Sequence, residues 1–256
     1  MRRVIISSIA LVLIIGGIVL AAVPLFSNQS YSNKQKHRIE QFIEKCSEAA
    51  VTEPISETKP DDKNVQVAAM YNKEPLKLDL KRLREDVITY NKIIYREKQC
   101  NLKDKSSYQV ASLNIYDYGF QDGIYGYLSV DKLGLNMPIY LGANDYNMSL
   151  GAAHMSQTSI PYGGENTHSV IAGHCGYGYM NYFRYIDSLQ NGDDVKVTTP
   201  FGQLGYKVID KVIIKPSEFE PLRIKKGEDL LTLFTCYPYP TNKFRCCVIC
   251  ERSLNE

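Results

Sequence analysis

The chain begins with a long apolar run. Met1, Arg2 and Arg3 precede residues 4–26, a stretch of 23 residues without a charge. A helix that spans a bilayer needs about 20 apolar residues, whereas the apolar region of a cleaved signal peptide usually has about 7–15. The run therefore predicts a transmembrane anchor, although Ala21-Ala22 also offers a cleavage site. The two arginines before the run place residues 1–3 in the cytoplasm and the remaining chain outside the cell.

Residues 27–109 have a helical and turn-rich pattern. A modest helix is expected over His37–Ala50, with Ile39, Phe42 and Ile43 on one side, and a linker or turn region over Thr52–Lys63. A second helix is expected over 77–98. Its apolar residues recur every three or four positions: Leu80, Leu83, Val87, Tyr90 and Ile94. We expect this membrane-proximal region to pack on the following domain or to space it from the membrane.

From about Asp122 the pattern changes to short β-type runs separated by turns. The expected strands cover 125–130, 137–141, 169–172, 194–198, 204–209, 211–214, 230–236 and 245–251. Only one short helix, over 180–189, interrupts them. Strands at this density favour a closed β-barrel over a sheet of βαβ units. The sequence thus predicts a mainly β domain over 110–256.

Charge and cysteine content narrow the possible functions. The chain has 30 basic and 28 acidic residues, and without Arg2 and Arg3 the two kinds balance. A nucleic-acid-binding protein would show a basic excess, so that class is disfavoured. The seven cysteines leave at least one unpaired thiol outside the cell. Cys246, Cys247 and Cys250 fit buried positions of one strand better than metal ligands, and no other metal-binding set is visible.

Three reactive side chains follow or flank apolar runs near the end of the chain. Cys236 ends the run 230–236, Arg245 begins the next run, and His174 follows the run that ends at Ala172. A thiolate can attack a carbonyl, an imidazole can carry protons, and a fixed guanidinium can stabilise an oxyanion. This set predicts acyl transfer through a thioester. Period-two alternation puts His168 on the same side as His174, so the pattern does not decide between the two histidines.

The segment 232–236, together with Gly173-His174 upstream and Arg245 downstream, resembles the sortases of Gram-positive bacteria. The segment 159–174 is similar to the region around the catalytic histidine of class C, the pilin polymerases. The resemblance covers roughly residues 110–252. It implies an eight-stranded sortase β-barrel with Cys236 as nucleophile, His174 as general acid and base, and Arg245 as oxyanion or substrate stabiliser. It also implies supporting roles for Thr235 and His168.

The resemblance further implies the reaction and the partners. A class C sortase cleaves an LPXTG-like sorting signal through a thioester and joins it to an amine, here a pilin lysine. The alternatives are a peptidoglycan amine, in a sortase that anchors surface proteins to the wall, and water, in a cysteine peptidase. No cofactor is expected. The enzyme would lie in the cell membrane with its catalytic domain on the extracellular face.

One motif of the family is missing. Class C sortases commonly carry an Asp-Pro-aromatic lid upstream of the barrel, and this chain contains no Asp-Pro pair. The stretch 101–122 also contains no proline, which would otherwise stiffen a turn. We therefore expect Asp117, Tyr118 and Phe120 to form at most a loose flap over Cys236.

Overall fold

The computed structural model describes residues 2–51, 77–176 and 181–253, and within the first helix it describes the side chains of 13–18, 30 and 33–51. The expected turn region 52–63 lies outside the described residues. The helices and short 3₁₀ turns are α1 (Arg2–Val51), α2 (Leu80–Arg96), α3 (Lys105–Gln109), η1 (Ile115–Tyr118), η2 (Asp131–Leu133), α4 (Asp145–Leu150), η3 (Ile186–Ser188) and η4 (Glu220–Leu222). The strands are β1 (Gly126–Val130), β2 (Leu135–Leu141), β3 (Ala152–His154), β4 (Thr167–Ala172), β5 (Asp194–Thr199), β6 (Gly202–Ile214), β7 (Asp229–Tyr237) and β8 (Phe244–Arg252).

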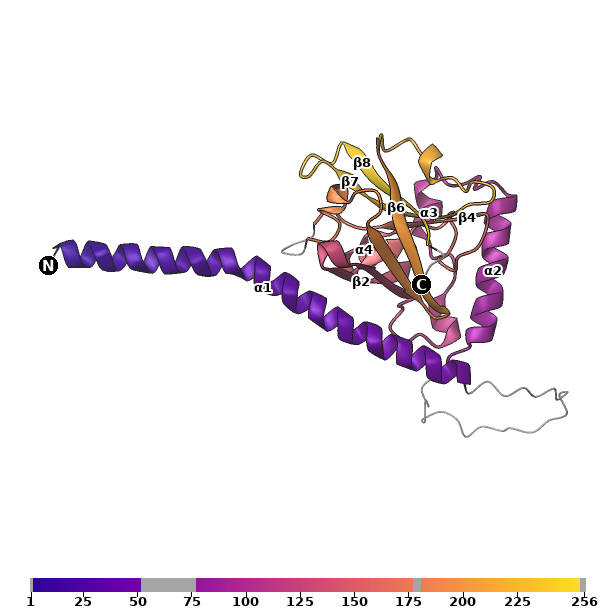
Figure 1. Cartoon of the computed structure of the whole chain (residues 1–256), viewed down its shortest axis with the longest axis horizontal. Helices are drawn as coiled ribbons and strands as arrows, with labels where there is room; N and C mark the ends of the chain where they lie inside the picture. Colours follow the sequence, from indigo (N-terminus) through magenta and orange to yellow (C-terminus); the bar gives the residue numbers. More distant parts are fainter. Residues whose placement is uncertain (1, 52–76, 177–180, 254–256) are drawn as a thin grey trace.

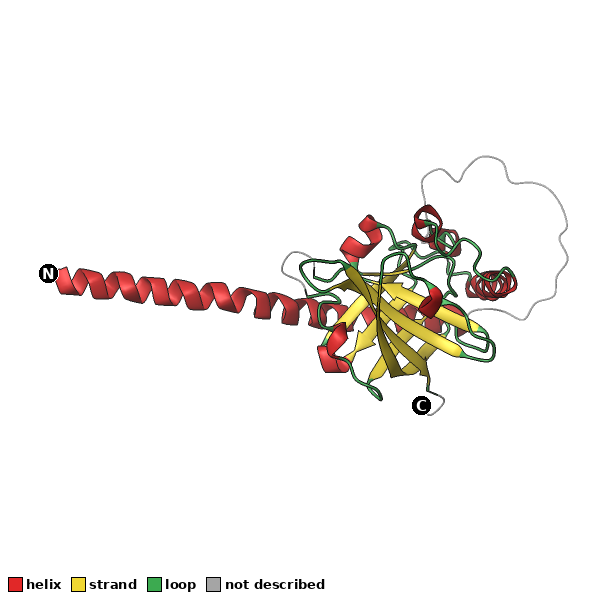
Figure 2. Cartoon of the chain, turned by 90° about the horizontal axis from the view of Figure 1, so that it is seen from above, coloured by secondary structure: helices red, strands yellow, loops and turns green. Residues whose placement is uncertain are grey.

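The strands form a closed barrel (Figure 2). Their order around it is β1-β2-β3-β4-β7-β8-β6-β5. Most neighbours are antiparallel, but β2–β3 and β4–β7 are parallel. The prediction of a mainly β, closed, eight-stranded barrel is confirmed. The parallel pair β4–β7 matters most for the site, because parallel strands bring their carboxyl ends to the same edge of a sheet.

The number of strands is right, but two of the expected boundaries are wrong. The runs 204–209 and 211–214 belong to one strand, β6, whose pairing with β8 shifts between Val208 and Asp210. This bulge explains why the sequence pattern predicts two strands instead of one, because an extra residue breaks the alternation of side chains. The eighth strand is β3, whose three residues are too few to show a period.

The prediction of a helix over 180–189 is also wrong. Its described part is a turn at 182–185 followed by the 3₁₀ turn η3. Phe183 and Ile186 are both buried in the barrel core. The amide of Phe183 donates to the carbonyl of His174 at 3.0 Å. Because this bond ties the turn to the end of β4, the segment follows the barrel edge instead of forming an α-helix.

The barrel has an apolar interior and two apolar clusters on its outer surface. The interior cluster includes Leu128, Ile139, Val197, Leu231, Leu233 and Val248. On β8, Cys246 and Cys250 belong to this interior, whereas Cys247 belongs to an outer cluster. This alternation agrees with the interpretation of these cysteines as buried strand residues.

The N-terminal helices cover one outer face of the barrel. The N-terminal half of α1 projects away from the barrel (Figures 1 and 2), while α2 lies against it (Figure 1). Phe42 and Cys46 of α1 are buried against the outer faces of β1 and β2, together with Leu83 and Val87 of α2. The predicted apolar side of α2 is confirmed. On α1, however, Ile43 is exposed, because the buried side continues from Phe42 through Cys46 to Ala49.

The structure leaves the membrane anchor a prediction. A single helix runs through the predicted span and the polar residues after it. Among residues with described side chains, no helix is sufficiently long and apolar to cross a bilayer. Most of the predicted span, 4–26, falls outside that set.

Two histidines are fully buried in the barrel wall. His154 bonds through Nε2 with the carbonyl of Ser159 at 3.0 Å, and His168 bonds through Nδ1 with the carbonyl of Arg223 at 2.9 Å and through Nε2 with the Thr232 hydroxyl at 2.7 Å. Burial lowers the pKa of each imidazole to about 4, while the backbone hydrogen bonds oppose the shift. Both rings are therefore neutral at physiological pH.

These histidines make folding stability depend on pH. Their pKa is about 6.5 when unfolded and about 4 when folded, so the unfolded chain binds protons first. Their contribution is complete above about pH 6.5 and is lost as the pH falls toward 4, on the order of a few kcal/mol for each ring. We expect urea unfolding to show this decline between pH 7 and pH 4.5.

A variant separates this effect from the titration of carboxylates. In His168→Gln the pH-dependent loss should be smaller than in the native chain, because one of the two groups is gone. A native chain and a variant with the same slope of stability against pH would contradict the assignment to His168.

Candidate active site

Cys236 is the second-to-last residue of β7, which lies between β4 and β8. Leu231 and Leu233 point into the barrel, whereas Phe234 packs in the outer cluster. Alternation along the strand then places Cys236 on the outer face beyond Phe234. Its thiol is free and half-buried. The sequence therefore ends an apolar strand with a nucleophile that faces outward.

Arg245 is the direct partner of Cys236 in the antiparallel ladder between β7 and β8. Side chains of directly opposed residues lie on the same face, with Cβ atoms about 4.5–5.5 Å apart. The guanidinium Nη1 donates to the carbonyls of Asn242 at 3.1 Å and Phe244 at 2.9 Å. Both bonds come from the same nitrogen, Nη1, so they engage only part of the five N–H donors of the guanidinium. The hairpin thus fixes a cation beside the thiol.

His174 lies two residues beyond the end of β4. The register of β4 with β7 pairs Ala172 with Phe234, and the amide of Gly173 donates to the carbonyl of Phe234 at 3.1 Å. Continuing this register by two residues brings His174 level with Cys236. The three predicted catalytic residues therefore meet at one edge of the barrel, at the ends of three neighbouring strands.

Thr235 fixes this arrangement from inside the wall. Its buried hydroxyl donates to the carbonyl of Gly173 at 2.7 Å. Gly173 is required here, because a Cβ at this position would lie 2.8 Å from the ring of Phe183. The phenyl ring and the Thr235 hydroxyl thus hold the backbone immediately before His174. This position of Thr235 is compatible with the predicted supporting role.

The structure separates the two histidines that alternation left equivalent. His168 pairs with Leu230, six residues before Cys236, which is about 20 Å along the strand. Both of its ring nitrogens are engaged inside the wall. His168 therefore lies far from the thiol, and its position is that of a structural residue. The other buried histidine, His154, is the last residue of β3.

A second thiol lies close to the nucleophile. Cys175 is buried beside His174. Burial raises the pKa of the Cys175 thiol, and the nearby Cys236 raises it further. Cys175 therefore remains a protonated thiol at neutral pH, and the half-buried Cys236 is the more accessible of the two thiols.

The residues that could form at most a loose flap pack against the N-terminal helices. The Tyr118 hydroxyl donates to Asp86 of α2 at 2.7 Å. Phe120 is buried with its ring centroid 6.0 Å from that of Phe42 on α1. Asp117 accepts from the Asn114 side chain. Burial against α1 and α2 holds the two rings on the outer face of β1 and β2, so they do not cover Cys236, which is within the expectation of at most a loose flap.

Sequence reasoning missed the segments that border the site. An outer cluster on β4, β7 and β8 contains Phe234 and Cys247, and Phe219 and Leu222 of the β6–β7 connection pack on it. The Tyr108 ring of α3 lies 6.4 Å from that of Phe219. Burial raises the pKa of Tyr108, and the Arg245 guanidinium opposes the shift, so Tyr108 lies near that guanidinium. The Asp104 N-cap of α3 was the available sequence signal.

Among the residues that the structure describes, the cavities lie away from Cys236, His174 and Arg245. Two described cavities of about 710 and 800 Å³ are lined by α2 and the β5–β6 hairpin, and the second also by Asp229 and Arg252, at the opposite ends of β7 and β8 from Cys236 and Arg245. The chemistry of the residues at the other edge identifies the site instead. A thiol, a guanidinium and an imidazole on adjacent strand ends can form and resolve a thioester.

Comparisons with known proteins agree with this geometry. A family model described as "Sortase domain" matches residues 128–253. No curated protein matches the sequence. Among solved structures, the chain is similar to sortase C1 of Streptococcus agalactiae in complex with MTSET, at 30% identity and a TM-score of 0.62, covering 68% of this chain and 89% of that one.

Two further structures give the same result. The chain is similar to sortase C-1 of Actinomyces oris, at 32% identity and a TM-score of 0.59, covering 68% of this chain and 98% of that one. It is also similar to a pilus-related sortase C of Group B Streptococcus, at 27% identity and a TM-score of 0.60, covering 70% and 93%. The barrel, the aligned strand ends and these similarities lead to one conclusion. The chain belongs to the sortase family of cysteine transpeptidases and is similar to its class C members.

Proposed function

We propose that this sortase joins pilin subunits by transpeptidation. The observation that carries the proposal is the meeting of Cys236, His174 and Arg245 at the ends of β7, β4 and β8. Its class C neighbours, one of which is described as pilus-related, support a pilin as the substrate. A sorting signal similar to LPXTG would be the donor, and a pilin lysine would be the acceptor.

The reaction would proceed in two balanced steps. The Cys236 thiolate attacks the carbonyl carbon of the signal's threonine, the C–N bond after it breaks, and a thioester forms. His174 gives a proton to the departing amine. The acceptor amine then attacks the thioester, loses a proton to His174 and forms a new amide, and the thiolate returns. Holding the reacting groups on adjacent strands replaces encounters in solution by a fixed geometry.

Arg245 would stabilise the negative oxygen of each tetrahedral intermediate. Its direct pairing with Cys236 supports this role, because an attacked carbonyl must lie within reach of both side chains. Arginine remains charged at any accessible pH, so it can face an oxyanion without exchanging a proton. The bonds from Nη1 to the hairpin carbonyls reduce the freedom of the guanidinium.

The predicted location of the enzyme in the cell membrane would suit a pilin substrate. Residues 4–26 would anchor the chain in the cell membrane, with residues 1–3 inside and the catalytic domain, about 110–256, on the outer face. The uncharged run and the two preceding arginines support this orientation. Protease treatment of intact cells tests it, since a barrel protected from external protease would contradict an exterior domain.

Product analysis tests the reaction. We expect mass spectrometry to show a peptide carrying the sorting signal joined to a pilin lysine, with a transient thioester on Cys236. Cys236→Ala should abolish both cleavage and joining while the barrel stays folded. Release of the cleaved peptide to water, even when the pilin acceptor is in excess, would favour a peptidase. Joining only to a peptidoglycan amine would favour wall anchoring.

The two histidines should differ in their effect on rate. His174→Ala should reduce turnover by about 10²–10⁴-fold, the usual contribution of a general acid and base. His168→Ala should act mainly through stability, because its ring lies inside the wall. Kinetics of both variants at a temperature where both are folded make the comparison. The reverse order would assign proton transfer to His168.

Arginine at position 245 should not be replaceable by lysine. Arg245→Lys keeps the charge but loses the planar set of donors. The loss of one oxyanion donor typically costs about 10²–10³ in rate, so a decrease of that size in kcat is expected on a sorting-signal peptide. Turnover within a few-fold of the native enzyme would reduce Arg245 to a general electrostatic role.

A further inference from the structure

The connection between β6 and β7, residues 215–228, borders the catalytic edge. Phe219 and Leu222 pack on the outer cluster that contains Phe234, two residues before Cys236 on the same face. Phe219 also contacts Tyr108, which lies near Arg245. An apolar peptide segment that leads to Cys236 along this face would therefore meet the β6–β7 connection.

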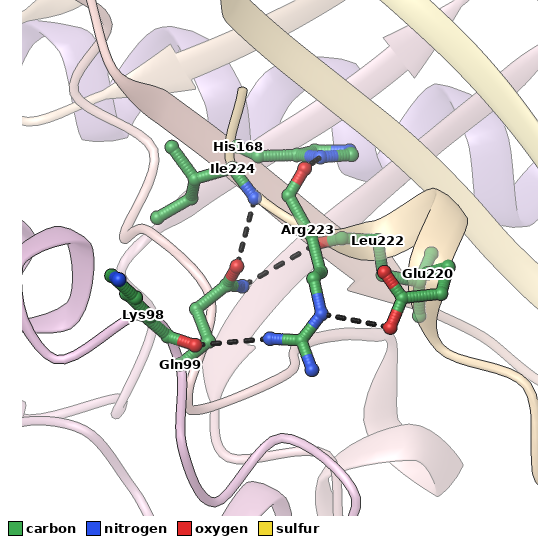
Figure 3. A network of polar contacts seen from close by, with 7 residues as sticks. All are labelled: Lys98, Gln99, His168, Glu220, Leu222, Arg223 and Ile224. Atoms are coloured by element: carbon green, nitrogen blue, oxygen red, sulfur yellow. Dashed lines mark hydrogen bonds and ion pairs between the residues drawn. The ribbon is translucent and has the colours of Figure 1, made fainter. Parts of the chain in front are cut away.

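The chain region just after α2 holds this connection from the outside (Figure 3). The buried Gln99 side chain donates from Nε2 to the carbonyl of Leu222 at 3.3 Å, and its Oε1 accepts from the amide of Ile224 at 2.8 Å. The same Nε2 donates to the carbonyl of Gln157 at 3.1 Å. One side-chain amide thus joins the end of α2, the β3–β4 segment and the β6–β7 connection.

Arg223 completes the attachment on both sides. Its Nη1 donates to the carbonyl of Lys98 at 2.9 Å, and its Nε donates to Glu220 at 3.0 Å. Its own carbonyl accepts from His168 inside the wall. The connection is therefore fixed at 222–224 between β4 and the N-terminal region (Figure 3).

The backbone of Lys98 and Gln99, just after α2, is in an unfavourable conformation. Lys98 and Gln99 have φ angles of 52° and 51°, in the left-handed region that residues with a side chain rarely adopt. This conformation directs the Lys98 carbonyl and the Gln99 side chain to the same connection. Such strain persists only where surrounding contacts enforce it, and it is concentrated at functional sites.

We propose that Gln99 is a positioning residue for the sorting peptide, acting through Leu222 and Ile224 of the β6–β7 connection. This inference rests on the proposed function, since it assigns the peptide a path along that connection. Gln99 touches neither Cys236 nor the other two catalytic residues in any described contact. Its loss should therefore weaken peptide binding more than the chemical step.

Asn91, on the helix α2 that precedes Gln99, supplies a matched control. It is also buried, and its side-chain amide bonds both backbone groups of Ile160, at 3.0 Å and 2.8 Å. Asn91→Ala and Gln99→Ala each remove a buried amide that joins the helical region to the barrel. Only Gln99 reaches the β6–β7 connection, so a purely structural role predicts equal effects from the two variants.

The experiment measures kcat and KM of the full chain for a sorting-signal peptide, and hydrogen exchange at the amide of Ile224. Gln99→Ala should raise KM about tenfold, the effect of losing one to two hydrogen bonds, with kcat changed less than about threefold and faster exchange at Ile224. Asn91→Ala should leave KM and this exchange unchanged. Equal KM values for the two variants, or an unchanged KM in Gln99→Ala, would overturn the proposal.

A second variant applies if Gln99→Ala does not fold. Arg223→Met keeps the aliphatic stem but loses the bond to Lys98, so KM should rise about threefold and an unchanged KM would overturn the proposal. If the proposed function is wrong, the experiment gives a different result. In that case the native chain cleaves the peptide without joining it to an amine, while KM for cleavage still reports the effect of Gln99.

Discussion

The active site depends on the parallel pairing of β4 with β7. This pairing is the reason that residues 62 positions apart, His174 and Cys236, come level at one edge of the barrel. The Thr235 hydroxyl and the Gly173 amide extend the pairing past the end of β4. A parallel pair brings both carboxyl ends to the same edge, whereas an antiparallel pair would carry the histidine to the opposite end of the cysteine strand. The β7–β8 hairpin then adds Arg245 by local pairing.

The barrel wall separates residues that serve stability from residues that serve chemistry. His154 and His168 are buried, hydrogen-bonded and neutral, so they contribute to a rigid wall and titrate only with loss of stability. The proposed catalytic residues occupy the strand ends, where the side chains are half-buried. Functional residues on such a rigid support keep their geometry through repeated turnovers.

The N-terminal region is part of the domain rather than only a spacer. Its α1 and α2 helices bury Tyr118 and Phe120 on one outer face. The residues after α2 hold the β6–β7 connection on another, through Gln99 and Arg223. A single segment before the barrel thus reaches two of its faces.

The sequence by itself determined the features that depend on local pattern. Alternation and turn residues predicted a closed barrel of eight strands, the apolar side of α2 and the buried strand positions of Cys246 and Cys247. Spacing placed Cys236 and Arg245 on consecutive strands, where pairing across a hairpin is a local matter. The family resemblance supplied the choice of His174.

Only the tertiary structure decided what depends on distant contacts. Alternation could not tell His174 from His168, because burial of His168 comes from packing by Arg223 and Thr232. The bulge in β6 and the short β3 have no clear period. Tyr118 and Phe120 lie away from Cys236 because they pack with Phe42 of α1 and Leu83 of α2. The role proposed for Gln99 likewise has no local signal, since its partners lie 58 to 125 residues away along the chain.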